Sequence, residues 1–304
     1  MIIDKQSEER IELRAPAKVN LRLEVLGKRP DGFHEVRLFM VAIELFDKMV
    51  VERRESGIEI SCPGIENGPG NLAWKAAELF FTETGVAGGA RIEIEKDIPA
   101  QAGLGGGSSD AAATLDALDI LYRTGLSEEK RRELAARLGS DIPFFIGTPR
   151  PAWALGRGEI IVPVEAELPE MWLVLIHPGI GVSTPVAYKA LEAAPIAESA
   201  LTALRAESMN TRLPGAPWEK NGGNFFLNDL EPPVFAHYPL IQDIKGMLQE
   251  AGAPLTLMSG SGSSVFGLFP EEGAARGVLN RARIPETYFR RVVRILRTVS
   301  GGTD

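Results

Sequence analysis

Hydrophobic and polar residues alternate strictly in the segment 19–25. Val19, Leu21, Leu23 and Val25 fall on one face, and Asn20, Arg22 and Glu24 fall on the other. A period of two is typical of a half-buried β-strand, and Lys18 is in phase with the polar face. Two more runs, 36–45 and 47–62, predict further strands, and the second is expected to fold into a hairpin near Ser56 and Gly57.

Helical spacing alternates with strand patterns through the rest of the first half. Asn71 is a suitable N-cap, and Ser127 and Gly139 are suitable end residues for a later helix. The expected elements are a helix from 72 to about 84, a strand over 90–99, a helix from about Ser109 to Arg123, and a helix over 128–138.

The second half also mixes strands and helices, without a strict strand–helix alternation. We expect strands over 151–164 and 171–178, helical segments over 185–206, a loop over 210–224, a helix near 240–251, strands over 255–258 and 264–269, another helix, and a last strand near 288–298. This mixture favours an α+β fold over a doubly wound parallel sheet. A boundary near residues 150–165 predicts two domains, 1–160 and 161–304.

Composition narrows the function without identifying it. The chain has 304 residues and a net charge of −8, and no run of Lys or Arg stands out, so we expect neither nucleic acid nor a membrane as a partner. Its only cysteine, Cys62, cannot form an internal disulfide, and no Cys/His spacing resembles a zinc site. The charged N-terminal segment and the short apolar runs predict a cytoplasmic protein.

The segment 103–109 is almost without side chains, since it holds four glycines, two serines and one leucine. It stands between a predicted strand and a predicted helix. The first N–H groups of a helix lack intrahelical partners and lie at the positive end of its dipole, and glycines let an anion approach them closely. The pattern therefore predicts a phosphate-binding loop, in which Ser108 and Ser109 add hydroxyl groups. The alternative is a glycine-rich turn without a ligand.

Better-known glycine loops do not match this segment. A Walker A loop requires a lysine, and this loop has none; a dinucleotide fingerprint requires glycine where Ser108 stands. A second loop, "SGSGSS" at 259–264, joins two predicted strands and lacks the Gly-x-Ser-x-Gly elbow of serine hydrolases. Taken alone it resembles a flexible hairpin connection. Together with the first loop, it is suited to close over the other side of a phosphate chain.

Three motifs resemble those of the GHMP kinases, a family of small-molecule kinases. They are "RAPAKVNLRLEV", "IPAQAGLGGGSSDAAA" and "LMSGSGSSVFGLF", and they occur in the family's order. The segments "DGFHEV", "GSDIPFF" and "HPGIGVSTPVAY" resemble the branch that phosphorylates a cytidine diphosphate-linked alcohol in isoprenoid biosynthesis. One departure is Ala100-Gln101-Ala102, where the family more often has a methionine and a glycine.

The resemblance implies a two-domain α+β fold with the active site in the cleft between the domains. It also implies ATP as the phosphate donor, Mg²⁺ carried with ATP, and a small-molecule acceptor. By match to the family motifs, the residues expected to bind ATP are Pro99, Ala100, Gln101, Ala102, Gly103, Leu104, Gly105, Gly106, Gly107, Ser108 and Ser109. Asp110 needs no catalytic role and is expected to point away from the phosphates.

By the same match, Asp141 is the expected base for the acceptor hydroxyl and Lys18 is the second catalytic residue. Without the match, Asp141 is well placed to cap a short helix and Lys18 is an ordinary solvated lysine. The residues expected to bind the acceptor are Asn20, Phe33, His34, Thr184, Tyr188, Gly260, Ser261 and Gly262. Two aromatic faces can sandwich a base, although core packing also explains these aromatic residues.

Two rival functions remain open at this point. Mevalonate, phosphomevalonate or homoserine kinase shares the family motifs, and only an acceptor with a nucleobase needs the aromatic residues. A nucleotide-binding regulator that keeps the fold without catalysis is the other rival. The presence of both Lys18 and Asp141 argues against that regulator.

Overall fold

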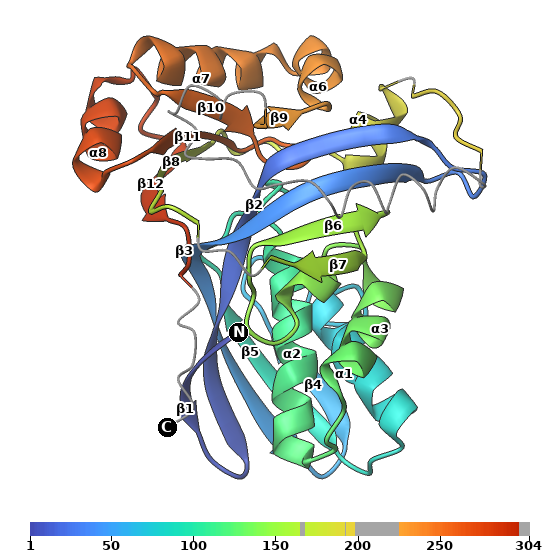
Figure 1. Ribbon diagram of the computed structural model, residues 1–304. Helices are drawn as coiled ribbons and strands as arrows, with labels where there is room; N and C mark the ends of the chain where they lie inside the picture. The colour runs from blue at the N-terminus through green and yellow to red at the C-terminus, as the bar shows by residue number, and fades with distance from the viewer. Residues whose placement is uncertain (165–167, 192, 198–224, 298–304) are drawn as a thin grey trace.

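The computed structural model describes residues 1–164, 168–191, 193–197 and 225–297. These residues form two β-sheets, each covered on its outer face by helices (Figure 1). The expected α+β class is confirmed.

The larger sheet has eight strands in the order β1-β2-β3-β5-β4, with β9 beside β2, β6 beside β3 and β7 beside β6. Its strands are β1 (Ile2–Gln6), β2 (Arg10–Lys28), β3 (His34–Arg54), β4 (Gly57–Ser61), β5 (Gly89–Glu95), β6 (Ala152–Gly156), β7 (Ile160–Pro163) and β9 (Leu227–Asn228). Helices α1 (Leu72–Thr84), α2 (Gly106–Tyr122) and α3 (Glu128–Leu138) lie on one side of it (Figure 1).

The smaller sheet is antiparallel, in the order β10-β11-β8-β12. Its strands are β8 (Trp172–His177), β10 (Leu255–Met258), β11 (Val265–Phe269) and β12 (Phe289–Arg294), and the helices of this half are α4 (Thr184–Lys189), α6 (Glu231–His237), α7 (Pro239–Glu250) and α8 (Glu272–Arg281). Among the described residues, no helix is both long and apolar enough to cross a membrane.

The hairpin expected near Ser56 is wrong. The run 36–45 and the first half of the run 47–62 belong to the single strand β3, and β4 pairs in parallel with β5 instead of folding back on β3. β5 takes the place beside β3 because it supplies a more completely buried face. Its Ala90, Ile92 and Ile94 are buried, whereas β4 contributes only Ile60.

The face of β2 that was expected to be solvated is also buried. Val19 and Leu21 pack in a core between the larger and the smaller sheet, so Lys18 and Asn20 point to the opposite side, where they are 3% and 1% exposed. A bulge between Asn20 and Arg22 then breaks the alternation, and Leu23 packs in the other core. One extra residue moves the following side chains to the other face.

One helix begins earlier than expected, and two elements of the structure were not expected. Helix α2 begins at Gly106, inside the glycine run, and α6 and β1 were not predicted. In α6 the two prolines stand in the first turn, where no intrahelical N–H bond is lost. Of the helical segments expected over 185–206, the structure describes only α4, and the loop 210–224 lies outside the described residues.

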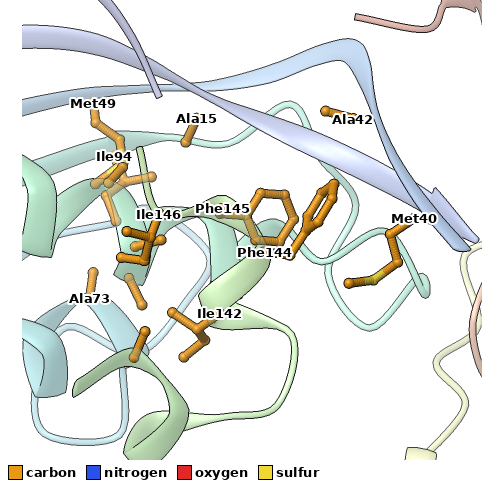
Figure 2. Packing of buried hydrophobic residues seen from close by; sticks show 14 of the residues in the cluster. Ala15, Met40, Ala42, Met49, Ala73, Ile94, Ile142, Phe144, Phe145 and Ile146 are labelled. Carbon is orange, nitrogen blue, oxygen red and sulfur yellow. The ribbon is translucent and has the colours of Figure 1, made fainter. Parts of the chain in front are cut away.

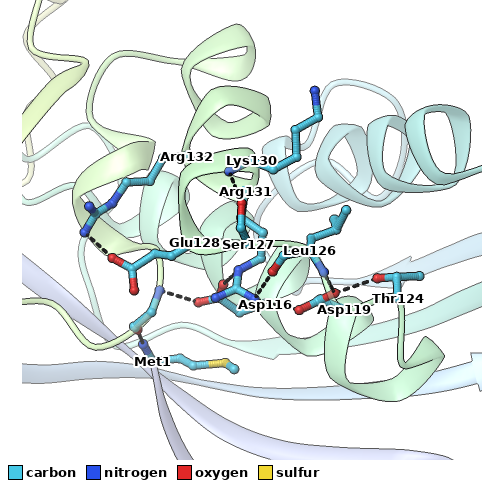
Figure 3. Close-up of polar contacts among 11 residues, drawn as sticks. Met1, Asp116, Asp119, Thr124, Leu126, Ser127, Glu128, Lys130, Arg131 and Arg132 are labelled. Carbon is cyan, nitrogen blue, oxygen red and sulfur yellow. Dashed lines mark hydrogen bonds and ion pairs between the residues drawn. The ribbon is translucent and has the colours of Figure 1, made fainter.

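The C-terminal half of helix α2 is held by α3 and by the segment that follows the 3₁₀ turn η1 (Ile142–Phe145). Arg131 of α3 contacts Asp116 (Nε–Oδ1, 2.9 Å) and Asp119 (Nη1–Oδ2, 2.6 Å) on α2, as Figure 3 shows. Asp116 also accepts a hydrogen bond from the Gly147 N–H (2.7 Å). Gly147 follows η1, whose side chains pack in the core beside α2 (Figure 2). These contacts fix the turn after Asp141 relative to the glycine loop.

Candidate active site

The glycine loop between β5 and α2 is fixed by its backbone. The Leu104 carbonyl oxygen accepts a hydrogen bond from the Lys18 N–H (2.9 Å), and the Ala102 carbonyl oxygen accepts one from the Ser264 N–H (3.2 Å). Gly103 has φ +75° and a Cβ there would lie 2.0 Å from the Ser259 carbonyl oxygen. Only glycine fits this position, because the second loop approaches so closely. The two glycine loops therefore lie against each other.

The helix end that follows is suited to bind an anion. Gly105 caps α2 with φ +72°, and no capping side chain covers the first turn among the described residues. A Cβ on Gly105 would lie 2.9 Å from the Phe145 ring, whereas one on Gly107 would meet nothing closer than 3.7 Å. The backbone at Gly107 and Ser108 is thus open on the side of the helix N-terminus, which suits a phosphate chain.

Lys18 and Asp141 meet at this loop although 123 positions separate them in the sequence. The Lys18 ammonium group lies 3.3 Å from Asp141 Oδ2 and donates a hydrogen bond to Asn20 Oδ1 (2.6 Å). The Lys18 side chain is 4% exposed and that of Asp141 is 34% exposed, so the carboxylate is the accessible partner. Asn20 Nδ2 is buried and has no hydrogen-bond partner in the described part of the chain.

The capping alternative for Asp141 is wrong. Asp141 precedes η1, but among the described residues its side chain makes no capping hydrogen bond. The alternative of a solvated Lys18 is wrong as well, because that side chain is buried. Neither helix capping nor an ordinary solvated lysine therefore explains the Lys18–Asp141 pair.

A cavity of about 570 Å³ joins these groups. Of the expected site residues, those that line it are Lys18, Asn20, Pro99, Ala100, Gln101, Ala102, Gly103, Gly105, Gly106, Gly107, Ser108, Asp141, Thr184, Tyr188, Gly260, Ser261 and Gly262. Leu104 and Ser109 are buried beneath the loop, each 1% exposed. Phe33 and His34 lie outside the lining of the cavity.

The expected aromatic pocket is only partly assembled. The rings of His34 and Tyr188 lie 5.2 Å apart between centroids, which leaves no room for a base between them. Phe33 is 51% exposed. Burial and the neighbouring Lys28 lower the pKa of His34, so its ring is neutral near pH 7 and offers one donor and one acceptor. Burial, together with Asp141 and Asp229, raises the pKa of Tyr188, which keeps the phenol protonated.

The far wall of the cavity connects α4 to the second glycine loop. The hydroxyl groups of Thr184 and Ser261 lie within hydrogen-bond distance (2.9 Å). Asn228, which the sequence reasoning did not single out, donates to the carbonyl oxygens of Met258 and Gly260 (both 2.8 Å) and so holds that loop. A lone asparagine in a two-residue strand gives no signal in the sequence.

Comparison with known proteins decides the family. The model of the GHMP kinase N-terminal domain matches residues 71–147, and that of the GHMP kinase C-terminal domain matches residues 200–285. The chain belongs to the GHMP kinase family.

Two relatives that align with most of this GHMP kinase have the same name. The 4-diphosphocytidyl-2-C-methyl-D-erythritol kinase of Citrifermentans bemidjiense is 42% identical over 271 residues, which cover 88% of this chain and 92% of the relative. That of Heliobacterium modesticaldum is 42% identical over 88% of this chain and 89% of the relative.

Solved structures agree with the family. A crystal structure of 4-(cytidine 5'-diphospho)-2C-methyl-D-erythritol kinase has a TM-score of 0.71 and 36% identity, covering 93% of this chain and 98% of that one. Homoserine kinase from Cytophaga hutchinsonii, at 19% identity and a TM-score of 0.67, covers 96% of each chain and shares the fold.

A second lysine reaches the glycine loop of this GHMP kinase from outside the motif. The Lys96 ammonium group contacts Asp47 of β3 and lies 2.7 Å from Asp110 Oδ2 in the first turn of α2. A Cβ on Gly106 would lie 3.2 Å from Lys96 Nζ. Asp110, which was expected to point away from the phosphates, lines the cavity, but its carboxylate is paired with Lys96. Lys96 stands outside the glycine loop, so no motif in the sequence indicates its contact with Asp110.

Side chains for a metal ion are few. No group of three or more His, Cys, Asp or Glu residues gathers in the described part of the chain. Asp110, the carboxylate in the first turn of α2, is already engaged by Lys96. The cavity offers the Ser108 hydroxyl group at the open end of the helix, which fits a Mg²⁺ ion that is held mainly by nucleotide phosphates.

Proposed function

We propose that this GHMP kinase transfers the γ-phosphoryl group of ATP to the 2-hydroxyl group of 4-diphosphocytidyl-2-C-methyl-D-erythritol. The observation that carries the proposal is the Lys18–Asp141 pair at the glycine loop, in a cavity whose opposite wall holds Thr184 and Tyr188. The name and full-length similarity of the relatives support the choice of acceptor.

Each side of the cavity has a role in this proposal. The backbone of residues 99–109 and the N-terminus of α2 bind the phosphates of ATP, and Mg²⁺ bound to ATP neutralises part of their charge. Gly260, Ser261, Gly262 and Thr184 bind the diphosphate side of the acceptor. Asn20 orients the acceptor hydroxyl group, since its unpartnered Nδ2 is available as a donor. Phe33, His34 and Tyr188 bind the cytosine base.

Asp141 acts as the general base in the proposed reaction. Its carboxylate takes the proton of the acceptor hydroxyl group while that oxygen forms a bond to the γ-phosphorus of ATP. The bond from this phosphorus to the β–γ bridging oxygen breaks, and ADP leaves with the electron pair. Lys18, which lies 3.3 Å from the Asp141 carboxylate, stabilises negative charge that develops on the transferred group. Such a reaction depends mostly on positioning and charge neutralisation.

The proposal also divides the chain into an ATP-binding domain, 1–160, and a C-terminal domain, 161–304. Its support is that β8 begins the smaller sheet at Trp172, whereas β6 and β7 belong to the larger sheet, which extends to Pro163, just past residue 160. Within the described part of the second half, the short strand β9 also joins the larger sheet.

A coupled assay of ADP release with Mg-ATP tests the function. It compares the cytidine diphosphate-linked acceptor with mevalonate, homoserine and galactose. We expect turnover with the cytidine-linked acceptor alone. Turnover only with another alcohol would keep the kinase and reject this acceptor. A folded protein that binds ATP and phosphorylates none of them would favour the nucleotide-binding regulator.

A further inference from the structure

The tip of the hairpin between β2 and β3 has a rigid backbone and one exposed ring. Arg29 contacts Asp31 (Nη2–Oδ2, 2.8 Å) and the fully buried Glu35 (Nη1–Oε2, 2.7 Å). Asp31 Oδ1 accepts a hydrogen bond from the Phe33 N–H (3.1 Å), and the Phe33 carbonyl oxygen accepts one from the Arg29 N–H (2.8 Å). The backbone of Phe33 is therefore fixed on both sides, while its ring is 51% exposed.

A residue from a different part of the sheet covers one face of that ring. The guanidinium carbon of Arg157 lies 4.8 Å from the centroid of Phe33. Arg157 stands in the turn between β6 and β7, where its N–H donates to Glu159 Oε2 (2.6 Å) and the Gly158 N–H donates to the Leu155 carbonyl oxygen (3.0 Å). Its side chain is only 31% exposed. The turn thus presents the guanidinium group from a fixed backbone.

The same turn touches the proposed reaction centre. A Cβ on Gly158 would lie 3.8 Å from Asp141 Oδ1 and 3.6 Å from the Ser140 side chain. His34, next to Phe33 in the chain, packs on Tyr188, which lines the cavity. Two consecutive residues of the β6–β7 turn, Arg157 and Gly158, therefore lie near the Phe33 ring and near the Asp141 carboxylate.

We infer that Arg157 is a positioning residue for the nucleobase of the acceptor: its guanidinium group holds the Phe33 ring so that the opposite face can stack on the base. This inference rests on the proposed function. An exposed aromatic side chain without such support must be ordered when a ligand binds, and that ordering lowers affinity. A planar guanidinium group can stack on the ring while its charge stays paired with nearby carboxylates, which a lysine ammonium group cannot do equally well. Arg157 touches neither the phosphates nor the transferred group in this role.

Binding of CDP to the protein saturated with ADP tests the inference, because ADP occupies the donor site and leaves CDP to report on the acceptor site. Calorimetric titration compares the wild type with Arg157→Met and Arg157→Lys. Arg53→Met is the matched control, since Arg53 stacks on Tyr122 at a similar distance (4.7 Å) far along β3 from the site. We expect Arg157→Met to weaken CDP binding about three- to tenfold, Arg157→Lys to fall between, and the control to match the wild type.

Steady-state kinetics with the cytidine-linked acceptor distinguish a positioning role of Arg157 from a general loss of structure in the variant. Arg157→Met should raise KM for the acceptor by the same factor, with kcat and KM for ATP within about twofold of the wild type. In a Phe33→Leu background, the Arg157→Met substitution should have no further effect, because there is no ring to hold.

The outcomes distinguish the two proposals. A wild type that phosphorylates the acceptor, with an Arg157→Met variant that binds CDP equally well, would overturn the role of Arg157 and leave the function intact. If Arg157→Met weakened CDP binding in the Phe33→Leu background by the same factor as in the wild type, the role of Arg157 would be overturned too. A wild type that neither binds CDP nor uses the cytidine-linked acceptor would overturn both.

Discussion

Two lysines, the buried Lys18 and the partly buried Lys96, flank the glycine loop, and their surroundings differ. The Lys18 ammonium group contacts one neutral partner, Asn20, and one carboxylate, that of Asp141, at 3.3 Å. The Asp141 side chain is 34% exposed. Lys96 lies between two carboxylates, Asp47 and Asp110, whose side chains are 0% and 5% exposed. Asp47 in turn accepts hydrogen bonds from the N–H groups of Asp97 and Ile98 (2.8 and 2.9 Å), which lead into the loop.

The two clusters have different roles at the same loop: one holds the backbone in place, and the other presents a carboxylate to the cavity. The Lys96 cluster (Asp47, Lys96 and Asp110) ties the end of β5, the middle of β3 and the first turn of α2 together. Its carboxylates are enclosed and cannot serve an acceptor. The Lys18 cluster (Lys18, Asn20 and Asp141) leaves its carboxylate accessible in the cavity. We therefore expect substitutions in the Lys18 cluster to change activity, and substitutions in the Lys96 cluster to change stability.

Asp141→Asn tests the first half of this contrast and has the largest expected effect. The amide cannot take the proton of the acceptor hydroxyl group, so we expect kcat to fall about 10²- to 10⁴-fold. Binding of ATP should persist, and the free energy of unfolding should change by no more than about 1 kcal/mol, because the side chain is partly exposed. Single-turnover kinetics and calorimetric ATP binding provide the measurements. Asp243→Asn, at an exposed position of α7, is the control. An Asp141→Asn variant with nearly full activity would remove Asp141 from the role of base.

Lys96→Met tests the second half. It removes the cation that contacts Asp47 and Asp110, and removal of one partner from a buried ionic cluster costs about 3–5 kcal/mol of unfolding free energy. Urea denaturation measures the cost. Lys48→Met is the matched control, since Lys48 pairs with Glu95 at the surface (3.2 Å) and should contribute less than about 1 kcal/mol. Equal stability of the two variants would show that the Lys96 cluster does not hold the loop.

Asp110 makes the stability of the Lys96 cluster depend on pH. Burial raises the pKa of Asp110 to about 7, against the opposing effect of Lys96. The native state therefore keeps a proton on Asp110 that the unfolded chain releases near its ordinary pKa of 3.8. The resulting contribution to stability is complete below about pH 4 and is lost as pH rises through about 7.

Comparison of Asp110→Asn with the wild type isolates this effect, because other titrating groups cancel in the difference. The unfolding free energy of the variant minus that of the wild type should rise between pH 4 and pH 7 and then become constant. Chemical denaturation at unit steps of pH provides the curve. A difference that stays flat over this range would contradict the protonated state of Asp110.

Features that depend on neighbouring residues could be predicted from the sequence, whereas contacts between residues far apart in the chain could not. The alternation around Val19, the cap at Asn71 and the glycine run are each visible within a few residues. The partners of Lys96 stand 49 and 14 positions away, so no local pattern indicates the Lys96 cluster. The bulge after Asn20 likewise arises from pairing with β3, which the spacing of β2 alone does not contain.

Substitution of Gln101, in the loop that lies between the two clusters, has the smallest expected effect on the free energy of unfolding. Gln101 has φ +53°, in the left-handed region that favours glycine. The strain of a side chain there is about 1–2 kcal/mol, whereas glycine raises the entropy of the unfolded chain by somewhat less. Gln101→Gly should therefore raise the unfolding free energy by up to about 1 kcal/mol. Gln101→Ala keeps the strain without the long side chain, and it should not share the gain. If the gain appeared in both variants, the side chain that lies against Gly181, and not the backbone, would be the source of the strain.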